Sequence, residues 1–430
     1  MTITLTSSAT TYHRIDLPNG MRIIAEEMPH THSASMGVFS RVGSRFEPAP
    51  LSGVSHFLEH MFFKGTQKRN ARQISEAIEG IGGVLNAYTS YEATCYYAKV
   101  ANIHFDRAVD TLSDMLLNSL FDPKEIEKER RVIVEEINMT LDSPSEWVHQ
   151  LLDETIWGDQ PLGRDIAGTA DTVSAISRDD LIGFMQQHYN APNTVISIAG
   201  NVPVAIMVDT WMQALGQYRD GVRFEPEPTR PPTPGPRVRL LPKQTEQANF
   251  CIGLPALPYS DPDRRALQVL NTILGGGMSS RLFQEIREEQ GLAYSVFSYT
   301  NEFDDAGKWV IYGGVEIGKV RQAMAACLNE LRHIRDTGIT ADELQHVKDQ
   351  VNGGMLIGLE DTWSVASRNG AHLLRYDTVI PVEQVVAEIE AVTQDDVMRV
   401  AQRLIKPDAL YLSVIGPYED ETPFLELLDV

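Results

Sequence analysis

Two segments of the chain that lie 216 residues apart share one pattern, and this repeat limits the possible folds more than any other feature of the sequence. Residues 176–185 (ISRDDLIGFM) and 392–401 (VTQDDVMRVA) each start with an apolar residue and a serine or threonine, followed after one residue by two aspartates. Ser177 and Thr393 are predicted to cap a helix whose dipole the aspartates stabilise. Each helix leads into an apolar strand at the same offset. We infer an internal duplication, so the two halves share one fold.

A proline-rich stretch separates the two halves. Residues 224–236 read FEPEPTRPPTPGP and contain six prolines. Because proline fixes φ and lacks a backbone donor, neither a helix nor a central strand can run through this stretch, and we interpret it as an extended linker. The length of 430 residues also exceeds the size that one hydrophobic core usually serves, about 250–300 residues. We therefore predict an N-terminal domain at 1–223, a linker at 224–236 and a homologous C-terminal domain at 237–430.

The spacing of apolar residues indicates the fold class of both halves. Strands are predicted from short apolar stretches, and amphipathic helices from apolar residues three or four positions apart. The strands occur in hairpin-like groups as well as after helices. We expect an α+β fold in which each domain is a mixed, mostly antiparallel sheet packed with helices. The predicted strands include 21–26, 34–42, 94–100, 194–200 and 410–416, and the predicted helices include 72–81, 104–119 and 319–335.

Charge and cysteine content exclude several classes of protein. The formal net charge is −22, and nucleic-acid binding is disfavoured because phosphate contacts need a basic face. An acidic surface fits a basic or neutral ligand, or it only keeps the protein soluble. The three cysteines, Cys95, Cys251 and Cys327, form no CxxC pair and are odd in number, which favours a reducing compartment. We see no secretory signal pattern and no apolar run of about 18 residues, so we expect a cytoplasmic protein without a membrane span.

The residues with the clearest chemical meaning lie in residues 53–66, which read GVSHFLEHMFFKGT. On a helix, His56 and His60 are four positions apart, so both rings emerge from one face and can bind one Zn²⁺. Glu59 lies on the same side and can act as general base for an attacking water. This is the HxxEH pattern of inverted zinc peptidases.

The surroundings of this motif favour a metal over a chance arrangement. Its apolar neighbours predict a buried helix, on which three ionisable groups require partners or a metal ion. We expect Ser52 or Ser55 to cap the helix and Gly65 to end it. The corresponding helix of the second half, near residues 265–278, contains no histidine. We therefore expect one metal ion per chain.

A catalytic zinc ion needs a third protein ligand and an open position. The helix predicted from Asp122 onward carries two adjacent glutamates. Glu135 shares a face with Lys128 and is expected to be solvated, whereas Glu136 lies on the apolar face together with Glu129. We expect Glu136 to bind the metal and Glu129 to hydrogen-bond a ligand. The alternative for both is a partly exposed helix face of mixed charge.

These motifs together resemble the pitrilysin-type (M16) zinc metallopeptidases, in particular the bacterial processing-peptidase-like group and the catalytic subunit of the mitochondrial processing peptidase. The resemblance covers essentially the full chain. Besides HFLEHMFFKGT, it rests on GSRFE (43–47), GGVLNAYT (82–89), ERRVIVEE (129–136) and GGGMSSRLFQEIREEQGLAY (275–294).

The resemblance implies a role for each matching residue. His56, His60 and Glu136 would bind zinc, Glu59 would be the base and Glu129 would support the site. Asn86 and the strand after it, with Ala87, would align substrate backbone by β-strand addition. In the second half, Tyr294 would hydrogen-bond a substrate carbonyl and Arg287 would help to hold it. From the residues alone, Asn86 could instead be a turn residue, Arg287 a surface residue and Tyr294 a core residue.

The resemblance also implies an enclosed chamber built from four such domains. Because one chain supplies two, we expect a homodimer in which the Arg287/Tyr294 pair of each chain serves the zinc of the other. The predicted function is a zinc-dependent endopeptidase for peptides or unfolded segments. Two alternatives stay open: a non-catalytic assembly subunit, and one subunit of a heterodimeric peptidase.

Overall fold

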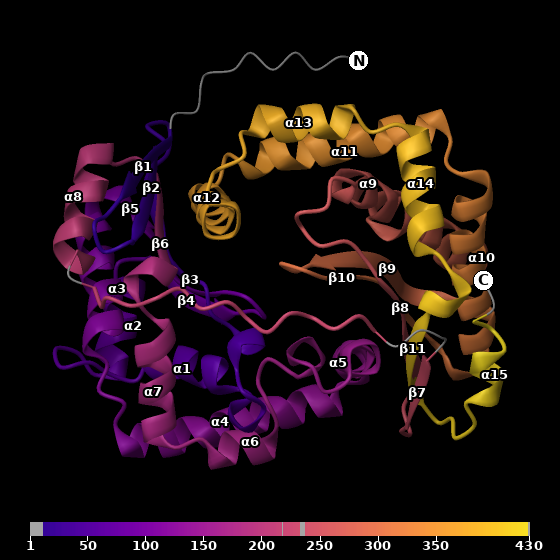
Figure 1. Ribbon diagram of the computed structural model, residues 1–430, viewed down its shortest axis with the longest axis horizontal. Coiled ribbons are helices and arrows are strands. Elements are labelled where there is room, and N and C mark those ends of the chain that lie inside the picture. The colour runs from indigo at the N-terminus through magenta and orange to yellow at the C-terminus, as the bar shows by residue number, and fades with distance from the viewer. Residues whose placement is uncertain (1–11, 217, 233–236, 429–430) are drawn as a thin grey trace. The chain divides into compact units, whose positions relative to one another are not determined.

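The structure is a computed structural model that describes residues 12–216, 218–232 and 237–428 (Figure 1). Its strands form a six-stranded sheet, in the order β1-β2-β6-β3-β5-β4, and a five-stranded sheet, in the order β7-β11-β8-β10-β9. Each sheet has one parallel pair, β2 with β6 and β7 with β11, and its other neighbours are antiparallel. The predicted α+β class with mixed, mostly antiparallel sheets is confirmed.

The elements lie close to their predicted positions, and the limits of the strands and helices that were predicted from apolar spacing differ by no more than two residues. The strands are β1 (Tyr12–Asp16), β2 (Arg22–Glu27), β3 (Ser33–Ser40), β4 (Val84–Thr89), β5 (Thr94–Ala101), β6 (Thr194–Gly200), β7 (Arg237–Pro242), β8 (Gln247–Pro255), β9 (Ala293–Glu302), β10 (Gly307–Glu316) and β11 (Tyr411–Gly416). The helices are α1 (Val54–Phe62), α2 (Ala71–Glu79), α3 (Phe105–Asn118), α4 (Pro123–Asp142), α5 (Pro144–Trp157), α6 (Ala170–Ala175), α7 (Arg178–His188), α8 (Val204–Leu215), α9 (Arg264–Gly275), α10 (Val320–Thr337), α11 (Ala341–Gly358), α12 (Thr362–Tyr376), α13 (Val382–Glu390), α14 (Gln394–Leu404) and α15 (Thr422–Leu425).

The duplicated segments have the same structure in both halves. Ser177 caps α7 and Thr393 caps α14, and each side chain accepts from the backbone amide of the second aspartate. The strands that follow are β6 and β11, and they occupy matching places in the two sheets. Strand β6 lies between its parallel partner β2 and the antiparallel strand β3, and β11 lies between its parallel partner β7 and the antiparallel strand β8. The strand orders β2-β6-β3-β5-β4 and β7-β11-β8-β10-β9 therefore correspond strand by strand, and β1 is an addition to the first sheet.

The compact units do not follow the order of the chain. One unit combines residues up to 135 with 166–227 and 355–380, and the other combines 136–165, 228–354 and 381–430. The halves thus exchange a segment each: α12 packs on β3 and β6 of the first sheet, and α5 packs on β8 and β11 of the second. The division predicted from the sequence, at 1–223, 224–236 and 237–430, does not include this exchange and stays a prediction. Part of the predicted linker, residues 233–236, lies outside the described residues.

The exchanged helices are attached by equivalent residues of the repeat. Ser197 of β6 donates its hydroxyl to the carbonyl of Ala366 in α12 at 2.6 Å. Ser413 of β11, 216 positions later, donates to the carbonyl of Val148 in α5 at 2.8 Å. Both serines are fully buried, so each bond satisfies a polar group that would otherwise lie unpaired inside the protein.

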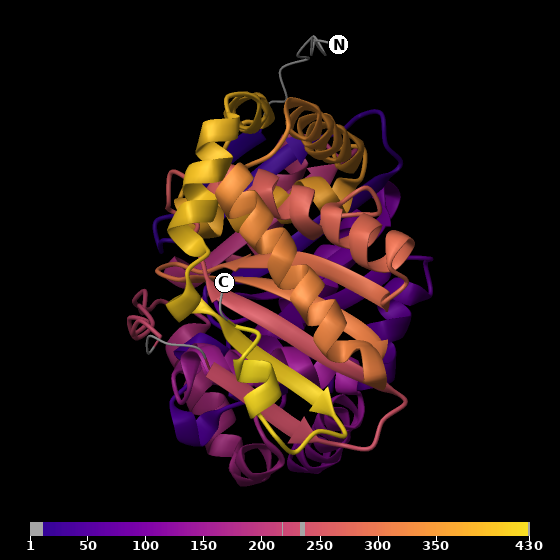
Figure 2. The ribbon, with the colours of Figure 1, turned by 90° about the vertical axis from the view of Figure 1, so that its right-hand side faces the viewer.

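Helices of the second half cover the other face of the second sheet. Figure 2 shows this helical layer in front of the strands. Apolar side chains of α9, α10 and α14 form one buried cluster with those of β8, β10 and β11. Among the helices that the structure describes, none is both long and apolar enough to cross a lipid bilayer.

Candidate metal centre

Helix α1 begins at a position that only glycine fits well. Gly53 has a φ of 95°, and a Cβ atom there would lie 2.4 Å from the carbonyl oxygen of Ala167. The predicted cap by Ser52 or Ser55 is wrong, because the N-cap residue is Gly53, which has no side chain to bond the helix. Instead, the buried carboxylate of Glu47 accepts from the amides of Gly53 at 2.8 Å and Ser55 at 2.7 Å. This negative group also complements the helix dipole.

The sequence of α1 leaves one accessible stripe on an otherwise buried helix. Val54, Phe57, Leu58, Met61 and Phe62 are each at most 1% exposed. The ionisable side chains of the HxxEH motif lie on the remaining face and are half-buried. The first sheet and its helices therefore fix the backbone of α1, while its three chemically active groups stay reachable.

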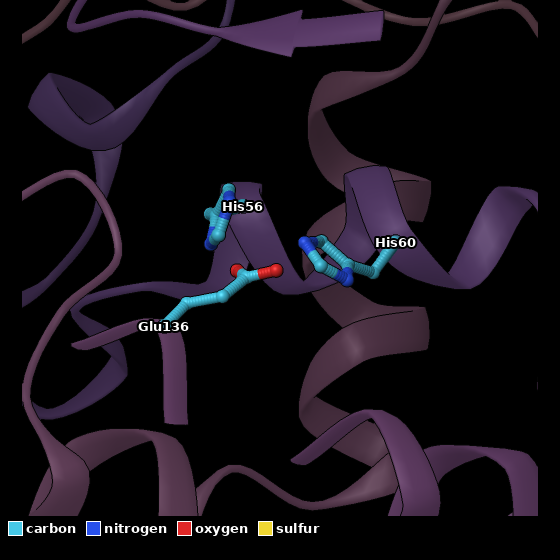
Figure 3. Close-up of side chains that lie close together, drawn as sticks. All are labelled: His56, His60 and Glu136. Carbon is cyan, nitrogen blue, oxygen red and sulfur yellow. The ribbon is translucent and has the colours of Figure 1, made fainter. Parts of the chain in front are cut away.

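Three of the predicted residues come together at this stripe (Figure 3). One donor atom each of His56, His60 and Glu136 lies within 4.8 Å of the other two, and the imidazole centroids of the two histidines are 4.7 Å apart. Glu136 lies in the same helix as Glu129, α4, although the boundary between the compact units falls inside this helix, directly before Glu136. Glu135 is exposed, as expected, although Lys128 pairs with Glu125.

The ligand chemistry of this cluster fits zinc. Two imidazoles and one carboxylate are a donor set of catalytic zinc sites, which keep a further position open. Burial, followed by the charge of His60, lowers the pKa of His56 from 6.5 to about 4. His56 is therefore a neutral imidazole near pH 7, as a metal ligand must be.

Glu129 lies behind the cluster and bonds one of its members. Its Oε2 is 3.1 Å from Nδ1 of His60, and its Oε1 is 2.8 Å from Nζ of Lys64. Burial alone would raise the pKa of Glu129, but the bonds to His60 and Lys64 outweigh it and hold this pKa below its usual value. An ionised Glu129 accepts a hydrogen bond from Nδ1–H of His60, which leaves Nε2 of that ring as the donor for a metal.

Glu59 is oriented by the strand beside α1. The hydroxyl of Thr89, at the end of β4, donates to Oε2 of Glu59 at 2.5 Å. Sequence reasoning assigned no role to Thr89, Lys64 or Glu47, although Glu47 and Thr89 end two of the motifs that carry the family resemblance. Thr89 and Lys64 contact residues far from them in the sequence, and Glu47 reaches the amides of α1 from the loop before it, so only the fold reveals these contacts.

The predicted substrate strand lies at the edge of the first sheet. Strand β4 pairs with β5 on one side and has no second strand neighbour in the described part of the chain. Asn86 lies within this strand, so its interpretation as a turn residue is wrong. Its Oδ1 accepts from the amide of Ala87 at 2.8 Å. An incoming peptide strand that bonds this amide would have to displace the Asn86 side chain.

The two predicted residues of the second half lie next to each other on unusual backbone. Arg287 belongs to a π-helix, Phe283–Glu289, and Tyr294 is the extra residue of a bulge in β9, where Gly314 and Val315 pair with the residues on either side of it. Bulges and π-helices often place side chains at functional sites. The guanidinium of Arg287 lies over the Tyr294 ring at 5.3 Å. Tyr294 is 76% exposed, so its interpretation as a core residue is wrong.

Comparison with protein families gives matches in both halves. Residues 22–170 match the family described as insulinase (peptidase family M16), and residues 175–351 match the family described as peptidase M16 inactive domain. In keeping with the second description, the described residues of that half contain no further group of histidine, cysteine and acidic side chains with metal-ligand spacing.

Relatives align over nearly the whole chain. An uncharacterized zinc protease of Streptomyces coelicolor is 42% identical over 96% of this chain and 91% of its own. Another from Bacillus subtilis is 39% identical over 94% of this chain and 98% of its own. Among solved structures, a protease from Helicobacter pylori has a TM-score of 0.90 at 22% identity, covering 95% of this chain and all of that one. A peptidase M16 inactive domain from Pseudomonas fluorescens has a TM-score of 0.86 at 17% identity, over 95% and 98% of the two chains.

Proposed function

Because the chain belongs to peptidase family M16, we propose that it is a zinc-dependent endopeptidase that cleaves peptides or unfolded segments of polypeptides. The observation that carries this proposal is the cluster of His56, His60 and Glu136, with Glu59 on the same accessible stripe of α1. We further propose one zinc ion per chain, in line with the single cluster of this kind among the described residues.

Each residue around the cluster has a separate task in this proposal. When bound, zinc supplies a Lewis acid that polarises the scissile carbonyl and acidifies water. Glu59 takes a proton from the attacking water and passes it to the leaving amine. Thr89 keeps the Glu59 carboxylate turned toward the site, and Glu129 holds His60 in the tautomer that binds metal.

Substrate binding involves both halves of the molecule in this proposal. A peptide adds to the free edge of β4 at Asn86 and Ala87, after the Asn86 side chain turns away. Tyr294 donates a hydrogen bond to a substrate carbonyl and to the oxyanion that forms from it, and its exposed ring supports this role. We propose a homodimer in which Arg287 and Tyr294 of one chain serve the zinc site of the other.

A second proposal concerns the compartment in which the protein works. Cys95, Cys251 and Cys327 are free thiols and all three are buried. Burial raises the pKa of Cys95 far above its usual value, so this thiol next to the site is chemically inert. These features support a reducing compartment, and we propose the cytoplasm.

The test compares zinc content and hydrolysis of the purified chain with those of matched variants. Unfolded casein and a fluorogenic peptide are the substrates. Glu59→Gln should keep zinc and lose hydrolysis, because it removes the base and no ligand. Glu136→Gln should lose zinc, while the neighbouring Glu135→Gln serves as a control and should match the wild type. A wild-type chain that binds zinc but cleaves neither substrate would favour the alternative, a non-catalytic assembly subunit.

A further inference from the structure

Phe283 lies in the π-helix one turn before Arg287 and contacts the same guanidinium as Tyr294. The guanidinium carbon of Arg287 is 4.8 Å from the centre of the Phe283 ring and 5.3 Å from the centre of the Tyr294 ring. A guanidinium attracts the face of an aromatic ring electrostatically, and contacts within about 6 Å are effective. One cation thus connects a ring anchored in a helix to a ring on the edge strand β9.

The anchoring of the two rings differs strongly. Phe283 lies next to Leu282, which is fully buried, and three positions before Ile286, which is also fully buried in the core of the second unit. Tyr294 is 76% exposed, and as the bulged residue of β9 it faces no partner residue across the ladder. Because its ring is so exposed, the contact with the Arg287 guanidinium can decide how the ring is oriented.

The backbone conformation of the π-helix suits this arrangement. Its wide turn is visible in the bond from the amide of Gln290 to the carbonyl of Glu285, five positions earlier, at 3.0 Å. A π-helix is rare and is frequently found at functional sites. Among the described residues, Arg287 forms one ion pair, with the carboxylate of Glu288 at 3.8 Å, and this pair is weak because both side chains are partly exposed.

We propose that Phe283 is a positioning residue of the peptidase, which holds Arg287 against Tyr294 and thereby fixes the direction of the Tyr294 hydroxyl. This inference rests on the proposed function, in which that hydroxyl stabilises the oxyanion. Phe283 itself touches neither substrate nor metal in this arrangement. Loss of its ring frees Arg287, and the Tyr294 hydroxyl then occupies its productive position for a smaller fraction of the time.

The experiment measures kcat and KM for Phe283→Leu, which keeps an apolar side chain and removes the ring. An exposed cation–π contact predicts a loss of about two- to fivefold in kcat. KM should stay nearly constant, because the hydroxyl acts on the transition state. Phe283→Trp should restore kcat, since indole binds cations better than benzene. Zinc content and the thermal unfolding midpoint of all variants provide the check on folding.

A double-mutant cycle separates positioning from a general structural effect. In a Tyr294→Phe background the hydroxyl is already absent, so Phe283→Leu should cause no further loss. Equal kcat for Phe283→Leu and wild type, equal losses in both backgrounds, or no rescue by tryptophan would overturn the inference. Each of these results requires an active wild type, whereas a wild type without hydrolysis would contradict the proposed function itself.

Discussion

The ammonium group of Lys64 and Nδ1 of His60 bind opposite oxygens of one carboxylate, that of Glu129, at 2.8 Å and 3.1 Å. Lys64 and His60 are both near the C-terminal end of α1, and Glu129 is 5% exposed on α4. A buried carboxylate that bonds a ligand histidine needs a counterion, and the fold supplies it one turn beyond His60. Helix α1 thus carries both histidines of the proposed zinc site, and the cation that pairs with Glu129 follows two residues after its end.

Replacement of Lys64 tests this relationship. Lys64→Met should weaken zinc binding by about 10–100-fold, the usual effect of losing a residue that supports a metal ligand. Lys64→Arg keeps the positive charge and should retain most of the affinity. Competition with a chelator, followed by fluorescence of a zinc dye, gives both affinities. Equal zinc affinity of Lys64→Met and wild type would show that Glu129 needs no counterion.

Removal of the Glu47 carboxylate should destabilise the start of α1. Glu47 accepts from two helix amides, and Glu47→Ala leaves both without this acceptor. We expect a loss of about 1–3 kcal/mol in the free energy of unfolding, since a helix cap contributes about 0.5–2 kcal/mol and a charged acceptor more. Urea unfolding in the presence of EDTA measures this without a contribution from zinc. Glu47→Gln, which retains one acceptor oxygen, should fall between wild type and Glu47→Ala.

Mixing two variants that each hydrolyse substrate poorly tests the proposed homodimer. If Tyr294 serves the partner chain, a dimer of one Glu59→Gln chain and one Tyr294→Phe chain has one site with both defects and one with neither. Exchange of subunits between the two variant homodimers should restore up to about a quarter of wild-type activity if the chains pair at random in a 1:1 mixture. No recovery after subunit exchange has been demonstrated would mean that Tyr294 acts within its own chain or not at all.

The buried histidine His188 should make stability depend on pH. Burial lowers its pKa from 6.5 to about 4, among the rings of Phe46, Phe184 and Phe224. Between pH 4 and pH 6.5 the unfolded chain binds more protons at His188 than the folded chain does. The free energy of unfolding therefore decreases as the pH falls from 6.5 to 4. The contribution of one such group is at most about 1.4 kcal/mol per pH unit.

His188→Leu removes this proton uptake and keeps an apolar side chain in the pocket. Unfolding curves at pH 5 and pH 7.5 should therefore differ less for the variant than for wild type. At pH 5 the variant should be at least as stable as the wild type. An unchanged pH dependence would show that His188 does not contribute to it.

Local features of the structure could be predicted from the sequence, because short-range chemistry determines them. The caps Ser177 and Thr393 follow from the residues within one helix turn. The side of α4 on which Glu136 lies follows from helical periodicity, although its role in metal binding stays a prediction. The cap of α1 was mispredicted because its acceptor, Glu47, reaches the helix from a preceding loop.

Features that depend on distant pairing could not be predicted. The bulge at Tyr294 results from how β9 aligns with β10, and no pattern in either strand shows it. The exchange of α5 and α12 likewise depends on which sheet face each helix covers. Both helices have an apolar face, and such a face can pack on any apolar surface, so the pattern does not indicate which sheet each helix covers.

The exchange of helices has a consequence for how the chain is made. The first sheet is complete once β6 has been synthesised, but its cover, α12, begins only at Thr362. At about 5–20 residues per second, the ribosome needs about 9–35 s to reach the end of α12. Until then the nascent chain exposes an apolar face that includes Phe39, Cys95 and Val195, which α12 later buries with Leu373. We therefore expect either half expressed alone to aggregate unless the other is supplied in the same cell.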